Sequence, residues 1–405
     1  MSAAAPTKSE RSAADAQAAL GVGATRSLER VLAAMGKLNG APIAFELVDD
    51  VPQGGVLCAL PALLAQGLLR HTRQTFDLPA GFYPLETYFL ALGFLALARV
   101  LSLEAMRYEP PGEWGKLLGL DRIPEVRTLR AKLGQLCQPG GRAQQWSQSL
   151  SQAWLAGSQQ SVGTTYVDGH VRVYHEKLTQ LPRRYVARER LRLRGTTDYW
   201  VNAMDGQPLF VVTAPVDPGL ITVLRQSVIP RLKADLPQTE RWTAQKAQLL
   251  QAIQARQKQL EELKASRRQT AKHVTLKELP EAQRFGQLRT DKKHLVDTIK
   301  LIAYRAETAL VQIVRETLRR WDDARALVRQ VLASAVDLRP DPAHQTLTVR
   351  LHRLATTAHD QTLRHLCEEL TATETVYPGT DLKLVYELVG EPPPQTNTEL
   401  PPKPG

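Results

Sequence analysis

The sequence predicts an α+β fold, with a small sheet in the middle of the chain and helical regions on both sides of it. Three observations predict it. β-Branched and aromatic residues gather in short runs between residues 164 and 213. Apolar residues recur at helical spacing through much of residues 26–137. A long, polar helical pattern extends over most of residues 239–335.

The chain is basic. Its 405 residues include 52 Lys and Arg against 41 Asp and Glu, which gives a formal net charge of +11 and a pI near 9.6. A positive balance of this size favours a polyanionic partner, most often nucleic acid. A basic protein without such a partner is the alternative. Cys58, Cys137 and Cys367 lie far apart in no metal-ligand spacing, which indicates free thiols in a reducing cytoplasm.

No segment suits export or membrane insertion. Residues 1–25 are rich in Ala and Ser, lack the apolar run of a signal peptide and are expected to be disordered. The most apolar stretch, residues 88–98, is far shorter than the ~20 residues that span a membrane. The Pro-rich tail, residues 391–405, is also expected to be disordered. The sequence therefore predicts a cytoplasmic protein with no membrane partner.

Residues 26–137 form the predicted N-terminal helical region. Within it, apolar runs indicate buried helices, and Ser27 is a residue type that caps helices. The expected elements are a helix at 28–35 capped by Ser27, a brief strand at 42–48, and core helices at 56–69 and 85–106.

Residues 110–136 are a helix-turn-helix candidate. A short helical turn ends at Gly119, and Pro124 suits the first turn of a second helix. Arg127 and Arg130 lie on that second helix and are candidate DNA contacts. An ordinary helical hairpin is the alternative. The apolar stripe of the second helix is Val126, Leu129, Leu133 and Leu136.

Residues 138–235 contain the predicted sheet. The run at 164–175 reads as a strand interrupted by Asp168, a residue that strands disfavour. Two further strands, 197–203 and 207–213, are joined through Asp205-Gly206, a strong hairpin signal, and a helix follows at 219–232. Three antiparallel strands and a helix are the opening of a ribonuclease H-like fold, whose first strand presents an aspartate to divalent metals.

Several runs together resemble a known family. The chain resembles the DDE-type transposases of bacterial insertion sequences over most of residues 40–390. The matching runs are YVDGHVRVYH at 166–175, RYVAR at 184–188, GTTDYWVN at 195–202, DRIPEVRTL at 121–129 and TVYPGT at 375–380.

The resemblance implies DNA strand transfer. This reaction is an in-line phosphoryl displacement at two metal ions about 3.5–4 Å apart. Mg²⁺ prefers oxygen ligands, and three carboxylates hold the pair in this family. By resemblance, Asp168 is the first of these catalytic and metal-binding acids. An Asp at a β-turn, helped by Gly169, is the alternative.

The chain departs from the family after residue 232. The resemblance implies a further strand ending in the second aspartate, then a helix carrying the glutamate. A long polar helix at about 240–268 follows instead, and Leu295-Val296-Asp297, the one near match, lies in a helical pattern. We therefore expect the second and third acids to be missing, as after an internal deletion. Asp198 is a weak substitute, Asp205 is explained by its turn, and Glu307 is expected on a solvated helix face.

A dense basic run lies beside the predicted strands. Such a run is usually solvated, but next to strands that face DNA it is a candidate phosphate-contact surface. The candidate contacts are Arg183, Arg184, Arg188 and Arg190, with Arg192 and Arg194 beyond them.

The last third of the chain is predicted as a helical arm followed by a small unit. The arm, residues 239–335, has the pattern of an antiparallel coiled coil, and it suits either self-association or packing within the chain. Residues 345–390 predict a βαβ-like unit. His352, His359 and His365 have no suitably spaced acidic partner and are expected to be plain surface histidines.

These observations predict a transposase-related DNA-binding protein with an incomplete, poorly active nuclease core and no cofactor. One alternative is an active strand-transferase that uses Mg²⁺ and unconventional acids. The other is a helical module that forms homo-oligomers or co-assembles with an intact transposase.

Overall fold

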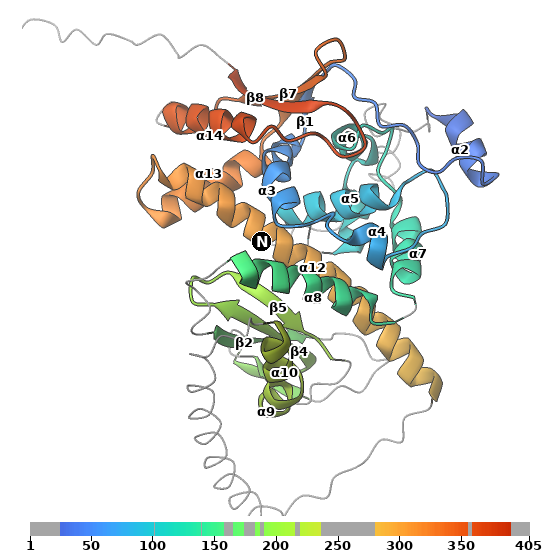
Figure 1. Ribbon diagram of the computed structural model, residues 1–405, viewed down its shortest axis with the longest axis vertical. Helices are drawn as coiled ribbons and strands as arrows, with labels where there is room; N and C mark the ends of the chain where they lie inside the picture. Colours follow the sequence, from blue (N-terminus) through green and yellow to red (C-terminus); the bar gives the residue numbers. More distant parts are fainter. Residues whose placement is uncertain are drawn as a thin grey trace, which may run out of the picture. The chain divides into compact units, whose positions relative to one another are not determined.

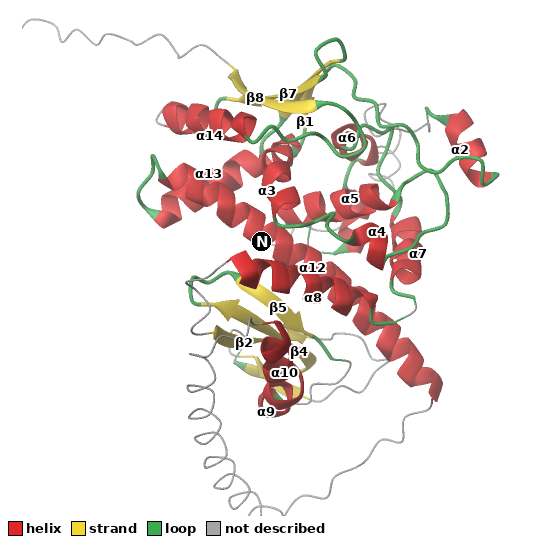
Figure 2. Cartoon of the chain, viewed as in Figure 1, coloured by secondary structure: helices red, strands yellow, loops and turns green. Residues whose placement is uncertain are grey.

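The chain forms two compact units. A computed structural model describes residues 25–100, 102–138, 140–157, 165–173, 183–186, 190–214, 219–235, 280–354 and 359–389. One unit comprises Met1–Trp146 with Leu295–Gly405, and the other comprises Ser147–His294. Figure 1 gives their elements and Figure 2 their secondary structure, which is α+β as predicted. The domain limits expected from the sequence stay a prediction.

The first unit contains a four-stranded sheet with the order β1-β6-β7-β8. β7 and β8 are parallel neighbours joined through α14, so the predicted βαβ unit is confirmed. Leu338, Val349 and Leu384 point into the core, while the alternate positions face outward. The elements are β1 (Val48–Val51), β6 (Val336–Asp341), β7 (Thr346–His352), α14 (Asp360–Ala372) and β8 (Lys383–Val389).

The predicted strand at 42–48 is wrong, because sheet pairing begins only at Val48. Residues 41–47 are irregular, and they lie against loops instead of a strand. The Ala44 N–H donates to the Gly119 carbonyl at 2.9 Å. The Ile43 side chain fills the space beside Gly379, where a Cβ would meet it at 2.8 Å.

The apolar segments of the first unit are buried as predicted, but their helices are shorter. α5 (Leu85–Leu97) stops well before residue 106 because Arg99 adopts a left-handed conformation, with φ 62°. The N–H groups of Arg99 and Val100 turn back to the carbonyls of Ala96 and Leu95, at 3.2 and 2.9 Å. This is a Schellman ending, which usually uses Gly. For an arginine it costs roughly 1–2 kcal/mol.

The predicted core helix at 56–69 is in fact two short elements. The 3₁₀ helix η2 (Gly54–Ala59) leads into α3 (Leu60–Ala65). Gly55 packs so tightly that a Cβ there would lie 1.7 Å from the Val331 carbonyl oxygen. Only glycine allows this close approach, which brings η2 against α13 (Trp321–Ala333).

The two helices of the helix-turn-helix candidate are present as α6 (Pro111–Leu117) and α7 (Val126–Leu136). Gly119 is left-handed, with φ 62°, and the predicted apolar stripe of α7 is buried. The helix α2 (Ser27–Ala34) is confirmed, but Ser27 is its first residue and makes no capping hydrogen bond. The other helical elements are α4 (Thr72–Thr75) and η3 (Leu103–Tyr108).

The second unit is a small sheet covered on one face by helices. β4 lies between β2 and β5, all antiparallel. Tyr199, Val201 and Phe210 form the core with Leu155 of α8 and Val223 of α9. The strands are β2 (Thr165–Val173), β3 (Arg183–Val186), β4 (Leu191–Ala203) and β5 (Pro208–Val212), and the helices are α8 (Arg142–Gly157), α9 (Leu220–Val223) and α10 (Ile229–Asp235).

The predicted turn and helix of this sheet are confirmed. The Gln207 N–H donates to Asp205 Oδ1 at 2.9 Å, and Gly206 has φ 82°, so Asp205 serves its turn. Between α9 and α10 the helix widens into a π turn, η4 (Leu224–Val228). Pro230 has no N–H to continue the regular hydrogen-bond ladder, which explains the wider turn.

Helix α12 (Pro280–Arg315) carries the apolar stripe predicted for this part of the chain. Leu295, Ile299, Ile302 and Ala306 are buried. The other predicted helix of the arm, at 240–268, lies outside the described residues, as do the predicted disordered ends, apart from Thr25. No helix in the described ranges is long and apolar enough to cross a membrane.

Candidate functional site

Asp168 lies in the middle of β2, on the outward face of the sheet of the second unit. It is paired with Trp200 of β4 in the strand register. Its neighbour Val167 packs against the core, so Asp168 points the other way, and it is exposed. The carboxylate of Asp168 therefore lies where solvent or a ligand can reach it.

Asp198 lies on the same face but is not available as a ligand. It is paired with His170, two residues along β4 from Trp200, and is therefore a diagonal neighbour of Asp168. Its side chain is fully buried and forms ion pairs with Arg172 of β2 and Lys293 of α12. Two cations already neutralise this carboxylate.

The described residues do not fit a centre for two metal ions. On this face they supply Asp168 as an exposed carboxylate, whereas two ions need several oxygen ligands. Across the parts of the chain that the structure describes, no group of three or more His, Cys, Asp or Glu side chains could hold a metal. Residues 236–279 lie outside those parts, so the loss of the second and third acids stays a prediction.

The basic run forms a two-stranded β-ribbon. β3 pairs with the first part of β4, so that Arg183 lies opposite Arg194 and Tyr185 opposite Arg192. Arg192 and Arg194 are exposed, and Arg190 has φ 53° in the turn. Arg184 lies opposite Leu193, while Arg188 lies outside the described residues. We call residues 183–186 and 190–194 the basic ribbon.

Arg192 and Arg194, whose side chains are exposed, give the basic ribbon positive charge at the start of β4. A β-ribbon is also one of the elements that proteins place in a DNA groove.

Arg127 and Arg130, the candidate contacts of the helix-turn-helix region, belong to the first unit. Both are exposed on α7, away from its buried stripe. Arg130 forms an ion pair with Glu104 of η3. Arg127 and Arg130 therefore present positive charge to solvent, with that of Arg130 partly neutralised.

Asp235 is a polar centre that sequence reasoning missed. It is buried at the end of α10 and accepts hydrogen bonds from Gln148, Ser151 and Gln152 of α8 at 3.0, 2.9 and 3.0 Å. Arg231 adds an ion pair at 3.3 Å and lies 4.0 Å over the Phe210 ring. Burial lowers the pKa of Arg231, although Asp235 opposes this. The i, i+3, i+4 spacing of the three α8 residues is the signal that could have found it.

The prediction that Glu307 lies on a solvated helix face is wrong. Its exposed fraction is 3%, and it forms ion pairs with Arg99, Arg325 and Arg329. Arg325 and Arg329 come from α13, which lies alongside α12 at this point, and Arg99 follows α5. The packing of three separate elements buries Glu307, although the sequence of its own helix suggests an exposed position.

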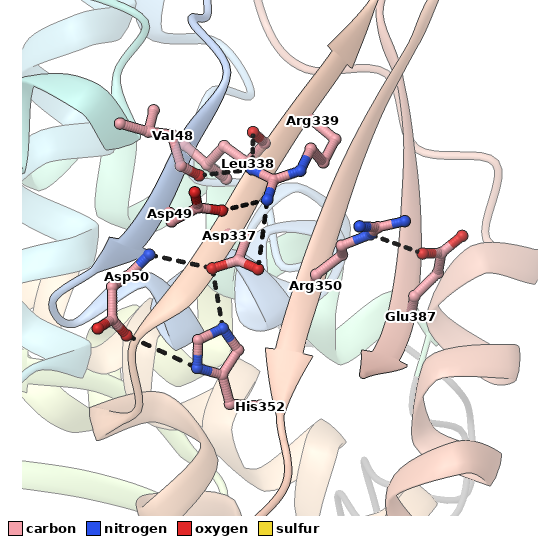
Figure 3. Close-up of polar contacts among 9 residues, drawn as sticks. All are labelled: Val48, Asp49, Asp50, Asp337, Leu338, Arg339, Arg350, His352 and Glu387. Carbon is pink, nitrogen blue, oxygen red and sulfur yellow. Dashed lines mark hydrogen bonds and ion pairs between the residues drawn. The ribbon is translucent and has the colours of Figure 1, made fainter. Parts of the chain in front are cut away.

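Two of the three histidines have acidic partners that their spacing in the sequence did not reveal, although the described residues contain no group of side chains that could hold a metal. His352 Nε2 lies 2.8 Å from Asp337 and its Nδ1 lies 3.6 Å from Asp50, and His365 lies 3.0 Å from Glu316. Figure 3 shows the His352 ring between the two aspartates, on the outward face of the sheet. Asp50 and Asp337 belong to β1 and β6, and Glu316 follows α12, so the partners come from other elements and spacing along the chain did not reveal them.

These outward contacts hold the short edge strand β1 on the sheet. Arg339 contacts Asp49 and donates to the Val48 carbonyl at 3.0 Å, and the Asp50 N–H donates to Asp337 at 3.0 Å (Figure 3). Partial burial raises the pKa of Asp337, but these hydrogen bonds and the His352 and Arg339 charges outweigh it, so its pKa lies below the ordinary value. These charged residues therefore have a structural role, which is to hold β1 on the sheet.

Comparison with known proteins identifies the family. A model of a family described as transposase protein matches residues 21–249 and 237–390, which is most of the chain. No curated protein matches the chain. No solved structure matches it either. Because this match extends over nearly the whole length, the chain belongs to the transposase family.

Proposed function

We propose that this transposase-family chain is a DNA-binding protein with an incomplete nuclease core of the DDE, ribonuclease H-like type, and that it cleaves DNA poorly or not at all. The observation that carries the proposal is the exposed Asp168, on the same sheet as the basic ribbon, with no second available carboxylate beside it among the residues that the structure describes. Such a surface can bind phosphates but lacks the ligands for two metal ions.

The strand order supports the ribonuclease H-like assignment. β2, β4 and β5 form an antiparallel meander followed by a helix, and Asp168 is in the first strand. The family match has two pieces, residues 21–249 and 237–390, which overlap at residues 237–249, so it neither supports nor opposes the proposed deletion.

DNA binding is expected to depend on salt and on the basic ribbon. Neutralised phosphates release counterions, so the affinity falls with salt, with a slope of about −0.9 per phosphate contact. We expect the double variant Arg192→Ala/Arg194→Ala to weaken binding about tenfold or more at low salt and to make the slope shallower. Gel-shift titrations of the full chain on duplex DNA at several salt concentrations measure both quantities.

A matched control removes two positive charges elsewhere. Arg73 and Arg320 are each 81% exposed and pair with Glu86 and Asp323, so Arg73→Ala/Arg320→Ala has the same change of net charge. This control should bind nearly as the unmodified chain does. An affinity that does not change with salt, or equal losses in both double variants, would contradict the proposed interface.

A further inference from the structure

A pocket of about 190 Å³ lies between the end of α5 and the middle of α12, within the first unit. It has an apolar wall and a polar side. The apolar wall includes Leu97, Val100 and Ala303, and the polar side is formed by Arg99, Lys300, Tyr304 and Glu307. No motif in the sequence pointed to this place.

The polar side carries more positive than negative charge. Glu307 is the shared partner of Arg99, Arg325 and Arg329, the last two at 3.8 and 3.4 Å. A carboxylate offers about four acceptor positions, whereas each guanidinium carries about five N–H donors. One buried glutamate therefore orients three guanidiniums without using most of their donors. Arg99 and Arg329 remain about half exposed, at 53% and 52%.

The backbone at Arg99 points to a role for its side chain. This residue takes the left-handed position after α5, where glycine is usual. A residue held in an unfavourable backbone conformation directs attention to function. Here the conformation places a guanidinium at the pocket, which glycine could not supply.

We propose that this pocket binds a phosphate group, with Arg99 and Lys300 of its lining supplying positive charge and Arg329, which shares Glu307 beside the pocket, adding to it. Guanidinium groups bind phosphate oxygens through paired hydrogen bonds, and their fixed orientation by Glu307 reduces the entropy lost on binding. The apolar wall leaves room for the sugar or other group that carries the phosphate. The pocket belongs to the first unit and the basic ribbon to the second. The proposed ligand is a phosphate of the DNA backbone or a free phosphate compound.

The first arm of the test uses inorganic phosphate. We expect phosphate to raise the melting temperature of the full chain more than chloride at equal ionic strength, because a ligand of the folded state stabilises it. Arg99→Gly and Arg329→Gln should lose this rise, with the affinity for phosphate reduced roughly tenfold or more. Arg73→Gln, an exposed arginine paired with Glu86, is the control and should keep it.

Arg99→Gly is suited to this test because glycine favours the left-handed conformation, so the backbone is relieved while the guanidinium is removed. Arg329→Gln removes the neighbouring positive charge that shares Glu307 with Arg99, without changing that turn. The proposal is overturned if phosphate gives no rise beyond chloride in the unmodified chain. It is equally overturned if both variants keep the full rise.

The second arm uses duplex DNA and separates the two sources of phosphate. If the ligand is the DNA backbone, Arg99→Gly also weakens the gel shift and makes the salt slope shallower by about 0.9. If the ligand is a free phosphate compound, the gel shift is unchanged while the melting effect is lost. A chain that shows the phosphate effect without binding DNA would support the pocket and contradict the proposed function.

Discussion

Lowering the pH from 7 to 5 is expected to destabilise the second unit by about 2 kcal/mol through His294 alone. This side chain of α12 is 3% exposed. Burial, helped by the neighbouring charges of Arg231 and Lys293, lowers the pKa of His294 to about 3. In the unfolded chain its pKa is about 6.5.

The direction follows from proton binding. Between pH 6.5 and 3 the unfolded chain binds a proton at His294 and the folded chain does not, so acid favours unfolding. The contribution of neutral His294 to the stability of the folded state is fully present above pH 6.5, and it is lost progressively as the pH falls towards 3. A histidine with a raised pKa would show the opposite dependence.

Hydrogen exchange of backbone amides in β4 and β5 measures this local stability at pH 7 and pH 5, after correction for the intrinsic exchange rate. His294→Gln cannot gain the charge and should lose about 2 kcal/mol less than the unmodified chain over this range. The exposed histidine His344, replaced by Gln, is the control and should leave the difference in place. Equal pH dependence in the unmodified chain and in His294→Gln would show that His294 is not held neutral.

Replacing Asp235 by Ala is expected to destabilise the second unit by about 3–5 kcal/mol. Its carboxylate is the common acceptor for Gln148, Ser151, Gln152 and Arg231. Removing it takes this acceptor from the buried Ser151 hydroxyl and from the largely buried, charged Arg231. α10 would then be attached to α8 only through the hydrogen bonds of Arg231 to Ser147 and Ser151.

Urea unfolding of the full chain, followed by exchange of amides in α8 and α10, measures this loss. Asp235→Asn is the matched control, because it keeps the shape and one acceptor oxygen but loses the charge, so it should fall between the unmodified chain and Asp235→Ala. A loss below about 1 kcal/mol in Asp235→Ala, the size of one ordinary hydrogen bond, would mean that water replaces the carboxylate.

The parts of the fold set by local chemistry could be predicted from the sequence. Asp205 and Gly206 determine a turn within a few residues, and the apolar stripe of α7 follows from helical spacing. The early end of α5 could not be predicted, because it depends on an arginine in a conformation that glycine usually takes. Short irregular segments such as residues 41–47 depend on loops far along the chain.

The exposed position of Asp168 followed from the strand pattern, but the buried polar groups did not. Glu307 meets Arg99 across 208 residues, and Ser151 meets Asp235 across 84. Spacing along the chain carries no information about such pairs. A carboxylate on a helix looks solvated until the packing of other elements supplies its cations.

We propose above all that the chain binds DNA without a working centre for two metal ions. The direct measurement is nicking of supercoiled plasmid in Mg²⁺ by the unmodified chain and by Asp168→Ala, with binding measured in parallel. We predict that both proteins bind the plasmid and that both leave it at the nicking level of plasmid without protein. Nicking by the unmodified chain that requires Mg²⁺ and disappears in Asp168→Ala would contradict the account.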